Sequence, residues 1–367
     1  MVVPQIGRDF AAAVGVLVVV TVAASVVGTV ITPRPSTSRL AHAMDRVVDT
    51  GFRAATRWSA SYLRRDRVLA AQAPTLLIVQ LITWLLLFFV GYSLILSSLI
   101  DGGITTAFSI AGSAFWGGGG ATARGVAVRV VLDTAALTSL VTIALQISYL
   151  PALYSAFNRR ATEVALLNAR AGLPAWGPEL LVRTHYGLGS GTSTLDTLPQ
   201  LYSDWERWGA DVMESHTTYP PLVRVRSPVA LSSWVTALLA VLDSAALILT
   251  LSPSKAPTVP ARLCLRSGFL CLREIAATMR LPGGDETNPT GISLTYEEFV
   301  DGVALMQAED FPIERRAEDA WPDFVGWRIN YEQAAYAIAL AVDAVPALWS
   351  GPRRFAPQPI RPIRPPL

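Results

Sequence analysis

Three long stretches without a charged residue constrain the fold of this chain more than any other feature. They cover residues 10–31, 75–100 and 134–157, and contain 22, 26 and 24 residues. A helix rises about 1.5 Å per residue, so roughly 20 apolar residues cross the hydrocarbon core of a bilayer. The stretches therefore predict three transmembrane helices. With 51% hydrophobic and 16% charged residues, the composition also excludes a disordered chain.

The arginines between these stretches predict how the spans are oriented, because Lys and Arg near a span stay on the cytoplasmic side. Residues 32–74 contain eight arginines, residues 101–125 contain one, and Arg159 and Arg160 follow the third stretch directly. We therefore expect a multi-pass plasma-membrane protein with an external N-terminus and a cytoplasmic C-terminal domain. The basic flank follows the first stretch, which favours an anchor over a leader cleaved near Ala24. The net charge of +2 predicts no nucleic-acid partner.

Within the arginine-rich loop, residues 41–71 place apolar side chains at helical spacing between charged ones. This pattern predicts one amphipathic helix. Such a helix either lies on the inner leaflet and binds anionic headgroups, or packs on the cytoplasmic part of the protein, and the sequence leaves both open. Membrane lipid is an expected partner in either case.

The connection between the second and third stretches predicts a re-entrant loop. Residues 101–125 are too apolar for an exposed loop and too short for another crossing. Irregular backbone at membrane depth has to be buried in protein or to line a water-filled cavity, and a pore meets this condition. A flexible hairpin between two anchors is the alternative. Residues 104–115 can form a helix of three turns, which is followed by Gly117, Gly118, Gly119 and Gly120.

This order of span, short helix, glycine-rich segment and span resembles the bacterial two-span potassium-channel-like membrane proteins. Two later stretches, which begin at Tyr149 and at Ser215, resemble the same proteins. The resemblance implies a homotetramer around a central pore, with K⁺ as the permeant ion and no other cofactor. It also implies a filter built from the backbone carbonyls of Trp116, Gly117, Gly118, Gly119 and Gly120.

The filter departs from the pattern of that family, which is Thr-x-Gly-Tyr/Phe-Gly followed by an acid. Gly118 and Gly120 match the two glycines. Trp116 stands at the threonine position, Gly119 at the aromatic position and Ala121 at the acid. These residues are compatible with unselective passive cation conduction, and equally with a membrane-anchored scaffold or sensor that keeps the pore fold without conducting.

Two residues of the region around the third span bear on a pore. Asp133 follows Arg129 by one helical turn, a spacing that favours a local ion pair, although an acid beside a pore also attracts cations. Pro151 interrupts the span near its inner end. We expect a cytoplasmic domain to act on the pore near this proline.

The chain as a whole is predicted to be an all-α membrane protein with five parts. Residues 1–32 form the anchor, residues 33–74 the arginine-rich linker and residues 75–157 the pore unit. A helical cytoplasmic domain follows over residues 158–351, and a Pro- and Arg-rich tail over residues 352–367 closes the chain.

One segment of the cytoplasmic region is ambiguous. A Ser-Pro pair at 227–228 is a good start for a helix over 229–251, which is long enough for a fourth span but contains Asp243. A carboxylate in the middle of a span is costly. We therefore expect a core helix of the cytoplasmic domain, with this carboxylate paired with an arginine such as Arg224 or Arg226.

Catalytic and metal-binding motifs do not emerge from the sequence. Cys264 and Cys271 are seven residues apart, too far for a redox or zinc pair, and predict buried, reduced thiols. His216 predicts a hydrogen-bonded structural group rather than a metal ligand. The stretch that begins at Gly187 lacks the Gly-Lys-Ser/Thr of a phosphate loop, and no G-x-S-x-G elbow is present. We therefore predict a protein that is not an enzyme and has no metal site.

Overall fold

The computed structural model describes residues 5–32, 38–59, 61–116, 125–186, 194–284 and 291–352. Within these ranges the chain forms helices and no strand, which confirms the all-α prediction. The chain divides into two compact units. Unit 1 comprises Met1–Ala54 and Gln72–Tyr154, and unit 2 comprises Ala55–Ala71 and Ser155–Leu367. Residues 353–367 of the predicted tail and the stretch 187–193 lie outside the described residues.

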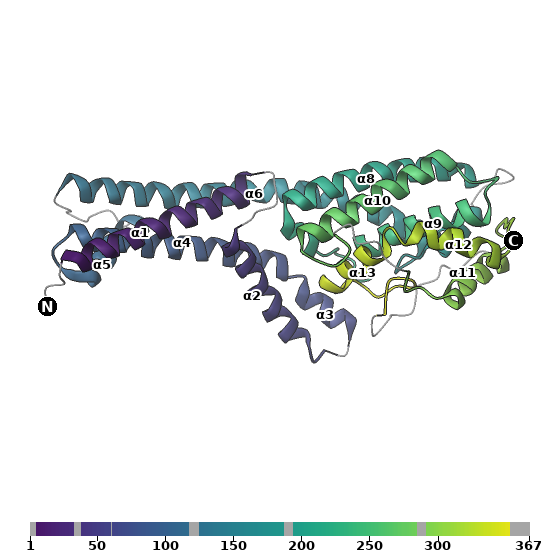
Figure 1. Cartoon of the computed structure of the whole chain (residues 1–367), viewed down its shortest axis with the longest axis horizontal. Coiled ribbons are helices and arrows are strands. Elements are labelled where there is room, and N and C mark those ends of the chain that lie inside the picture. Colours follow the sequence, from purple (N-terminus) through teal and green to yellow (C-terminus); the bar gives the residue numbers. More distant parts are fainter. Residues whose placement is uncertain are drawn as a thin grey trace. The chain divides into compact units, whose positions relative to one another are not determined.

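Unit 1 contains the helices on which the three predicted spans fall (Figure 1). Its elements are α1 (Gln5–Val26), a π-helical turn (Val27–Ile31), α2 (Arg39–Thr56), α4 (Gln72–Leu99), α5 (Gly103–Phe115) and α6 (Val126–Ala171). Both α2 and α6 end in unit 2. The first predicted span covers α1 with its π turn, the second lies on α4, and the third lies in the middle of α6.

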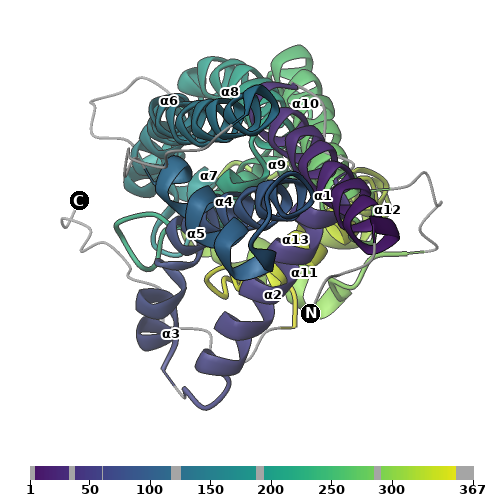
Figure 2. The ribbon, with the colours of Figure 1, turned by 90° about the vertical axis from the view of Figure 1, so that its left-hand side faces the viewer.

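Helices α1 and α4 lie side by side (Figure 2). Their contact is close because a glycine of each helix faces the other. A Cβ built on Gly15 would lie 2.6 Å from the carbonyl oxygen of Gly91. Farther along the pair, Trp84 of α4 is fully buried, and its indole N–H donates to the hydroxyl of Ser25 at 3.2 Å. Small residues at a helix contact are typical of membrane proteins, where close packing drives association.

The surface of unit 1 carries many exposed apolar side chains. In the most apolar 18-residue windows of the helices that contain the predicted spans, only 22%, 39% and 28% of the residues are buried. By length and composition these helices can cross a membrane, and so can a fourth, α9 (Trp234–Leu251). The exposed large side chains of α1, α4 and α6 include Phe10, Leu17, Ile78, Leu86, Leu137, Leu140 and Ile147.

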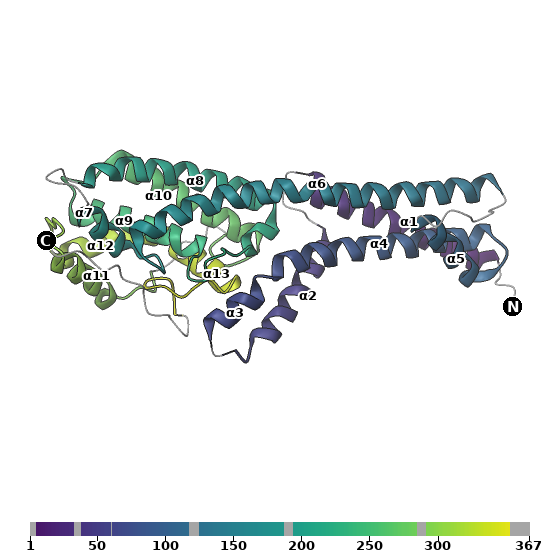
Figure 3. The same ribbon diagram turned by 180° about the vertical axis from the view of Figure 1, so that it is seen from behind.

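Unit 2 is a helical bundle built around α9 (Figure 3). In contrast to the helices above, 94% of the apolar window of α9 is buried inside the protein. The other elements are α3 (Tyr62–Leu69), α7 (Gly177–Tyr186), α8 (Leu198–Thr218), α10 (Thr258–Thr278), α11 (Tyr296–Ala308), α12 (Ala317–Arg328), α13 (Glu332–Ala341) and two 3₁₀ turns (Thr194–Thr197 and Pro220–Arg224). Of these, α7, α10 and α12 pack directly on α9, and α8 lies along α10.

The carboxylate of Asp243 on α9 is neutralised by an arginine, as the sequence predicted, although by neither of the two named candidates. The guanidinium of Arg328 is fully buried and donates to Asp243, and its Nε donates to Glu332 at 2.6 Å. Tyr331 also donates to Asp243, at 2.7 Å, and Tyr336 accepts from Arg328 at 2.8 Å. This network lets a carboxylate lie inside an apolar bundle, because each charge has hydrogen-bonded partners.

The start of α9 corrects the sequence prediction. The helix begins at Trp234, and the predicted start at 227–228 is wrong. The hydroxyl of Ser227 accepts the N–H of Val229 at 3.2 Å, which holds this stretch in a turn, and Ser233 is the extended N-cap residue. A Ser side chain that binds a nearby backbone amide competes with helix formation.

The prediction of a single amphipathic helix over residues 41–71 is also wrong, because this segment is divided into α2 and α3. The hydroxyl of Ser59 donates to the carbonyl of Ser61 at 3.3 Å, and Ser61 is extended as the N-cap of α3. The serines at this point favour a break by the same competition for backbone groups.

Candidate functional site

The predicted filter lies almost entirely outside the described residues, since Gly117, Gly118, Gly119 and Gly120 are not among them. Trp116 is described and follows the last residue of α5. Its side chain is 59% exposed, and its ring meets that of Phe115 edge to face at 5.3 Å between centroids. The candidate site is therefore the set of contacts that hold α5, the helix that precedes the predicted filter.

The short helix α5 forms as predicted and packs between α4 and α6. Ala107 and Ala111 of α5 are buried against Leu96 of α4 and against Val128 and Leu132 of α6. Alanines at i and i+4 present a flat face, so the backbone of α5 comes close to that of α4.

Aromatic rings hold the other side of α5. The ring of Phe89 on α4 meets Phe108 edge to face at 5.4 Å, and it lies 6.1 Å from the ring of Phe115. These two α5 residues are seven apart, so one phenylalanine of α4 spans two helical turns of α5.

The C-terminal end of α5 lies deep alongside the long helices rather than at their ends. The hydroxyl of Ser139 on α6 donates to the carbonyl of Phe115 at 3.1 Å. Ser139 is 13 residues into α6 from Val126, which corresponds to about 20 Å along the helix. Phe89 is ten residues from Leu99, the end of α4, or about 15 Å.

A second hydrogen bond joins α4 to α6 at the same level. The hydroxyls of Tyr92 and Thr138 lie 2.8 Å apart, and Thr138 directly precedes the serine that binds the end of α5. Polar side chains that bond across apolar helices fix their register. The end of α5 is therefore held by a polar layer shared by three helices.

The two other predicted site residues lie on α6. Asp133 and Arg129 are both exposed, and within the described residues neither has an oppositely charged group within 4 Å, so the predicted local ion pair is wrong. Arg8 instead pairs with Asp101 at 3.1 Å, which joins the start of α1 to the turn between α4 and α5. Pro151 is exposed on α6, and the helix continues through it.

Unit 2 contains a buried arginine near the start of the part of α6 that belongs to this unit. Arg160 is 2% exposed, and its guanidinium donates to Nε2 of His216 at 2.9 Å and to the carbonyls of Leu222 at 2.8 Å and Val225 at 2.6 Å. Burial lowers the pKa of Arg160 to about 9. Its partners are all neutral groups.

His216 has the structural role that the sequence predicted. It is fully buried, and its Nδ1 lies 3.0 Å from the hydroxyl of Ser215. Burial and, to a lesser degree, the charge of Arg160 hold the pKa of His216 well below its usual range. The imidazole is therefore neutral and can accept the guanidinium N–H.

The two cysteines are buried and free, which confirms the prediction of inert packing residues. Burial raises the pKa of both thiols. Within the part of the chain that the structure describes, no three His, Cys, Asp or Glu side chains lie together in a way that could hold a metal ion.

No family model, curated protein or solved structure matches this chain. Any function must therefore be argued from the geometry and the residues themselves. The sequence identified the short helix and the glycines that follow it but missed Ser139 and Phe89, which hold that helix. The spacing of polar residues along α6 was the available signal, since Ser139 and Thr142 share one face.

Proposed function

We propose that this chain is an integral membrane protein with three spans and a re-entrant helix, and that it conducts cations passively as an oligomer. The observation that carries this proposal is the hydrogen bond from Ser139 to the carbonyl of Phe115, about 20 Å along α6 from its first residue. Ser139 lies five residues, or about 8 Å, inside the third predicted span, which begins at residue 134, and this contact supports a helix that dips into a bilayer about 30 Å thick.

The contrast in burial supports three spans rather than four. The helices of unit 1 leave most of their apolar windows uncovered, whereas α9 is 94% buried and carries a neutralised carboxylate. A helix whose apolar face is already covered by protein gains nothing from lipid. The arginines on either side of the spans support a plasma-membrane orientation with unit 2 in the cytoplasm.

The direction of α5 supports a preference for cations. The C-terminal end of a helix carries a partial negative charge, because its last carbonyls have no partner within the helix. Ser139 binds only one of these carbonyls. The end of α5 therefore favours a positive ion, and the backbone carbonyls predicted for the filter would add to this preference.

One loop cannot surround an ion, so conduction requires several copies of the chain. The resemblance in sequence supports a tetramer. The exposed apolar side chains of α6, such as Leu137 and Leu140, offer a surface for a second copy as well as for lipid.

The proposal is tested by flux in liposomes. The purified full chain is reconstituted with a potassium gradient, and cation efflux is measured for the wild type and for Gly118→Ala. We expect flux in the wild type and its loss in this variant. Gly112→Ala is the matched control, because a Cβ there meets only the ring of Phe89 at 3.6 Å, an ordinary contact.

A second pair of variants tests the contact that carries the proposal. Ser139→Ala removes the bond to Phe115 and should reduce flux, whereas Ser148→Ala removes only a bond within α6 to Leu145 and should not. Wild-type liposomes without flux, from a preparation that is oligomeric in mild detergent, would refute conduction.

The second candidate is a non-conducting membrane-anchored scaffold or sensor that retains the pore fold. It is favoured by the residue at the filter's threonine position, since Trp116 is large, 59% exposed and offers no hydroxyl ligand. The absence of flux from a correctly assembled oligomer would support this alternative.

A further inference from the structure

Arg160 differs from Arg328, which is also buried, and from the partly buried Arg226 in the partners of its charge. Arg328 lies against the carboxylates of Asp243 and Glu332, and Arg226 binds Asp66 at 2.5 Å. No carboxylate within the described residues lies within 4 Å of the Arg160 guanidinium. A buried charge without a counter-charge is costly, and an anion would offset that cost.

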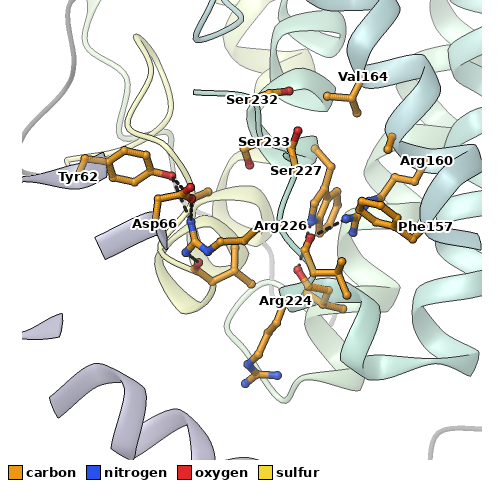
Figure 4. A pocket seen from close by; sticks show the side chains of 16 residues that line it. Tyr62, Asp66, Phe157, Arg160, Val164, Arg224, Arg226, Ser227, Ser232 and Ser233 are labelled. Atoms are coloured by element: carbon orange, nitrogen blue, oxygen red, sulfur yellow. Dashed lines mark hydrogen bonds and ion pairs between the residues drawn. The ribbon is translucent and has the colours of Figure 1, made fainter. Parts of the chain in front are cut away.

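A cavity adjoins this arginine (Figure 4). Its walls come from α3, from α6 between residues 157 and 164, from residues 223–227, from residues 232–234 at the start of α9, and from Val342 and Ala344. Its volume is about 40 Å³, which is enough for more than one water molecule or for a small polar group.

The charges around the cavity are unequal. Arg160 and Arg226 both line it, and Asp66 is the one acid among the lining residues. Arg226 neutralises that acid directly, and Tyr62 adds a neutral hydroxyl 3.2 Å from the same guanidinium. Arg224 also lines the cavity, but Figure 4 shows its guanidinium pointing away from the others. The charge that remains near the cavity is therefore positive.

Serine hydroxyls also line the cavity and can act as donors. The Oγ of Ser227 accepts the N–H of Val229 at 3.2 Å, and the Oγ of Ser232 accepts from Asn168 at 3.1 Å. Each hydroxyl keeps its own hydrogen for an acceptor in the cavity. Ser233 is the N-cap of α9 and makes no side-chain capping bond. The positive end of that helix dipole adds to the preference for an anion.

We propose that this cavity is a binding site for a phosphate oxyanion, held by the charge of Arg160 and by the hydroxyls of Ser227 and Ser232. The phosphate group can come from an anionic lipid headgroup or from a soluble phosphorylated molecule. Lipid headgroups are expected near the cavity, because Arg160 follows the end of the third predicted span by three residues. The inference does not depend on conduction.

The position of the cavity gives such a ligand a structural consequence. Tyr62 and Asp66 belong to α3, which precedes α4 by two residues, and Phe157 belongs to α6. The ligand would therefore lie between α3, which leads into α4, and the C-terminal part of α6. In the chain, α4 precedes α5 and α6 follows it. Its binding would favour the arrangement in which both elements pack on unit 2.

The test measures binding on the full purified chain. The melting temperature in detergent is followed during titration with inorganic phosphate against chloride at constant ionic strength. It is then measured in nanodiscs of phosphatidylcholine with and without phosphatidylglycerol. A saturable increase with phosphate indicates a soluble source, and an increase only with phosphatidylglycerol indicates a lipid source. No increase in either series would overturn the proposal.

The variants assign the response to the cavity. Arg160→Gln should abolish the increase, whereas Arg159→Gln should preserve it, because Arg159 is exposed and paired with Asp211. Should Arg160→Gln fail to fold, Ser227→Ala with Ser232→Ala provides a milder change, expected to weaken binding at least about tenfold. Equal responses of the wild type and of the serine variant, or equal losses in the two arginine variants, would contradict the assignment.

Discussion

The replacement Arg328→Met tests whether α9 is a core helix held by an ion network. The substitution removes the guanidinium that pairs with both Asp243 and Glu332, and it leaves two carboxylates inside the bundle. Breaking a buried ion pair by removing one partner typically costs about 3–5 kcal/mol of unfolding free energy. For a unit of this size the melting temperature should fall by roughly 6–20 °C. At pH 4 the deficit should be smaller, because burial raises the pKa of Asp243 and so favours its neutral form.

The assay is thermal unfolding of the full chain in detergent, followed by tryptophan fluorescence at pH 7 and pH 4. Arg316→Met is the matched control, since Arg316 is the N-cap residue of the same helix, is 74% exposed, and its ion pair with Asp319 is a surface contact. It should leave the melting temperature unchanged. If Arg328→Met lowered the unfolding free energy by less than about 1 kcal/mol at pH 7, Arg328 would not be the buried partner of Asp243 and Glu332. The argument that α9 is a core helix would then fail.

Three further predictions concern other parts of the molecule. Since burial and Arg160 depress the pKa of His216, the unfolded chain takes up a proton below about pH 6.5 that the folded chain does not. The unfolding free energy should thus fall by up to about 1.4 kcal/mol per pH unit from pH 6.5 downward, and His216→Gln, but not His42→Gln, should remove this slope in denaturant titrations. Gly15→Ala should lower thermal stability by about 1–3 kcal/mol, because the new methyl group meets a backbone carbonyl, whereas Gly112→Ala should not. The two cysteines should react with maleimide only after unfolding, and labelling of the native protein would contradict their burial.

The sequence predicted those elements that depend on local pattern. Apolar length located α1, α4 and the apolar part of α6. α6 ends at Ala171, directly before Gly172, whose φ of +79° favours a residue without a side chain. The helix over residues 104–115 was also predicted closely, since it is bounded by glycines on both sides.

The features that the sequence did not predict depend on partners far away in the chain. Hydropathy alone could not distinguish α9 from a span, because the residue that neutralises Asp243 is Arg328, 85 positions later. The same is true of the end of α5, since Ser139 binds a carbonyl 24 positions earlier. Two of the errors, at the start of α9 and between α2 and α3, arose where serine side chains bind nearby backbone groups within an otherwise helical pattern.

One face of α6 connects the two proposals. Its buried residues recur at steps of four or three, which makes a continuous stripe along the helix. They are Val128, Leu132, Ala135, Ser139, Thr142, Gln146, Tyr149, Leu153, Ala156, Arg160, Val164, Leu167 and Ala171. The stripe carries Ser139, which holds the end of α5, and Arg160, which lines the cavity, 21 residues later. A rotation of α6 as one body would disturb both contacts, unless Pro151, which cannot donate a backbone hydrogen bond, separates the two halves.

A double-mutant cycle distinguishes these cases. Unfolding free energies are measured for Ser139→Ala, for Arg160→Gln and for the double variant. Residues this far apart in a rigid structure without coupling are additive to within about 0.5 kcal/mol. We expect a larger interaction energy, because each substitution loosens the packing of the same buried face of α6, which contains both residues. Additivity would mean that the segment around Pro151 uncouples the two halves of α6. The binding of an anion at Arg160 would then have no effect on the end of α5 through this helix.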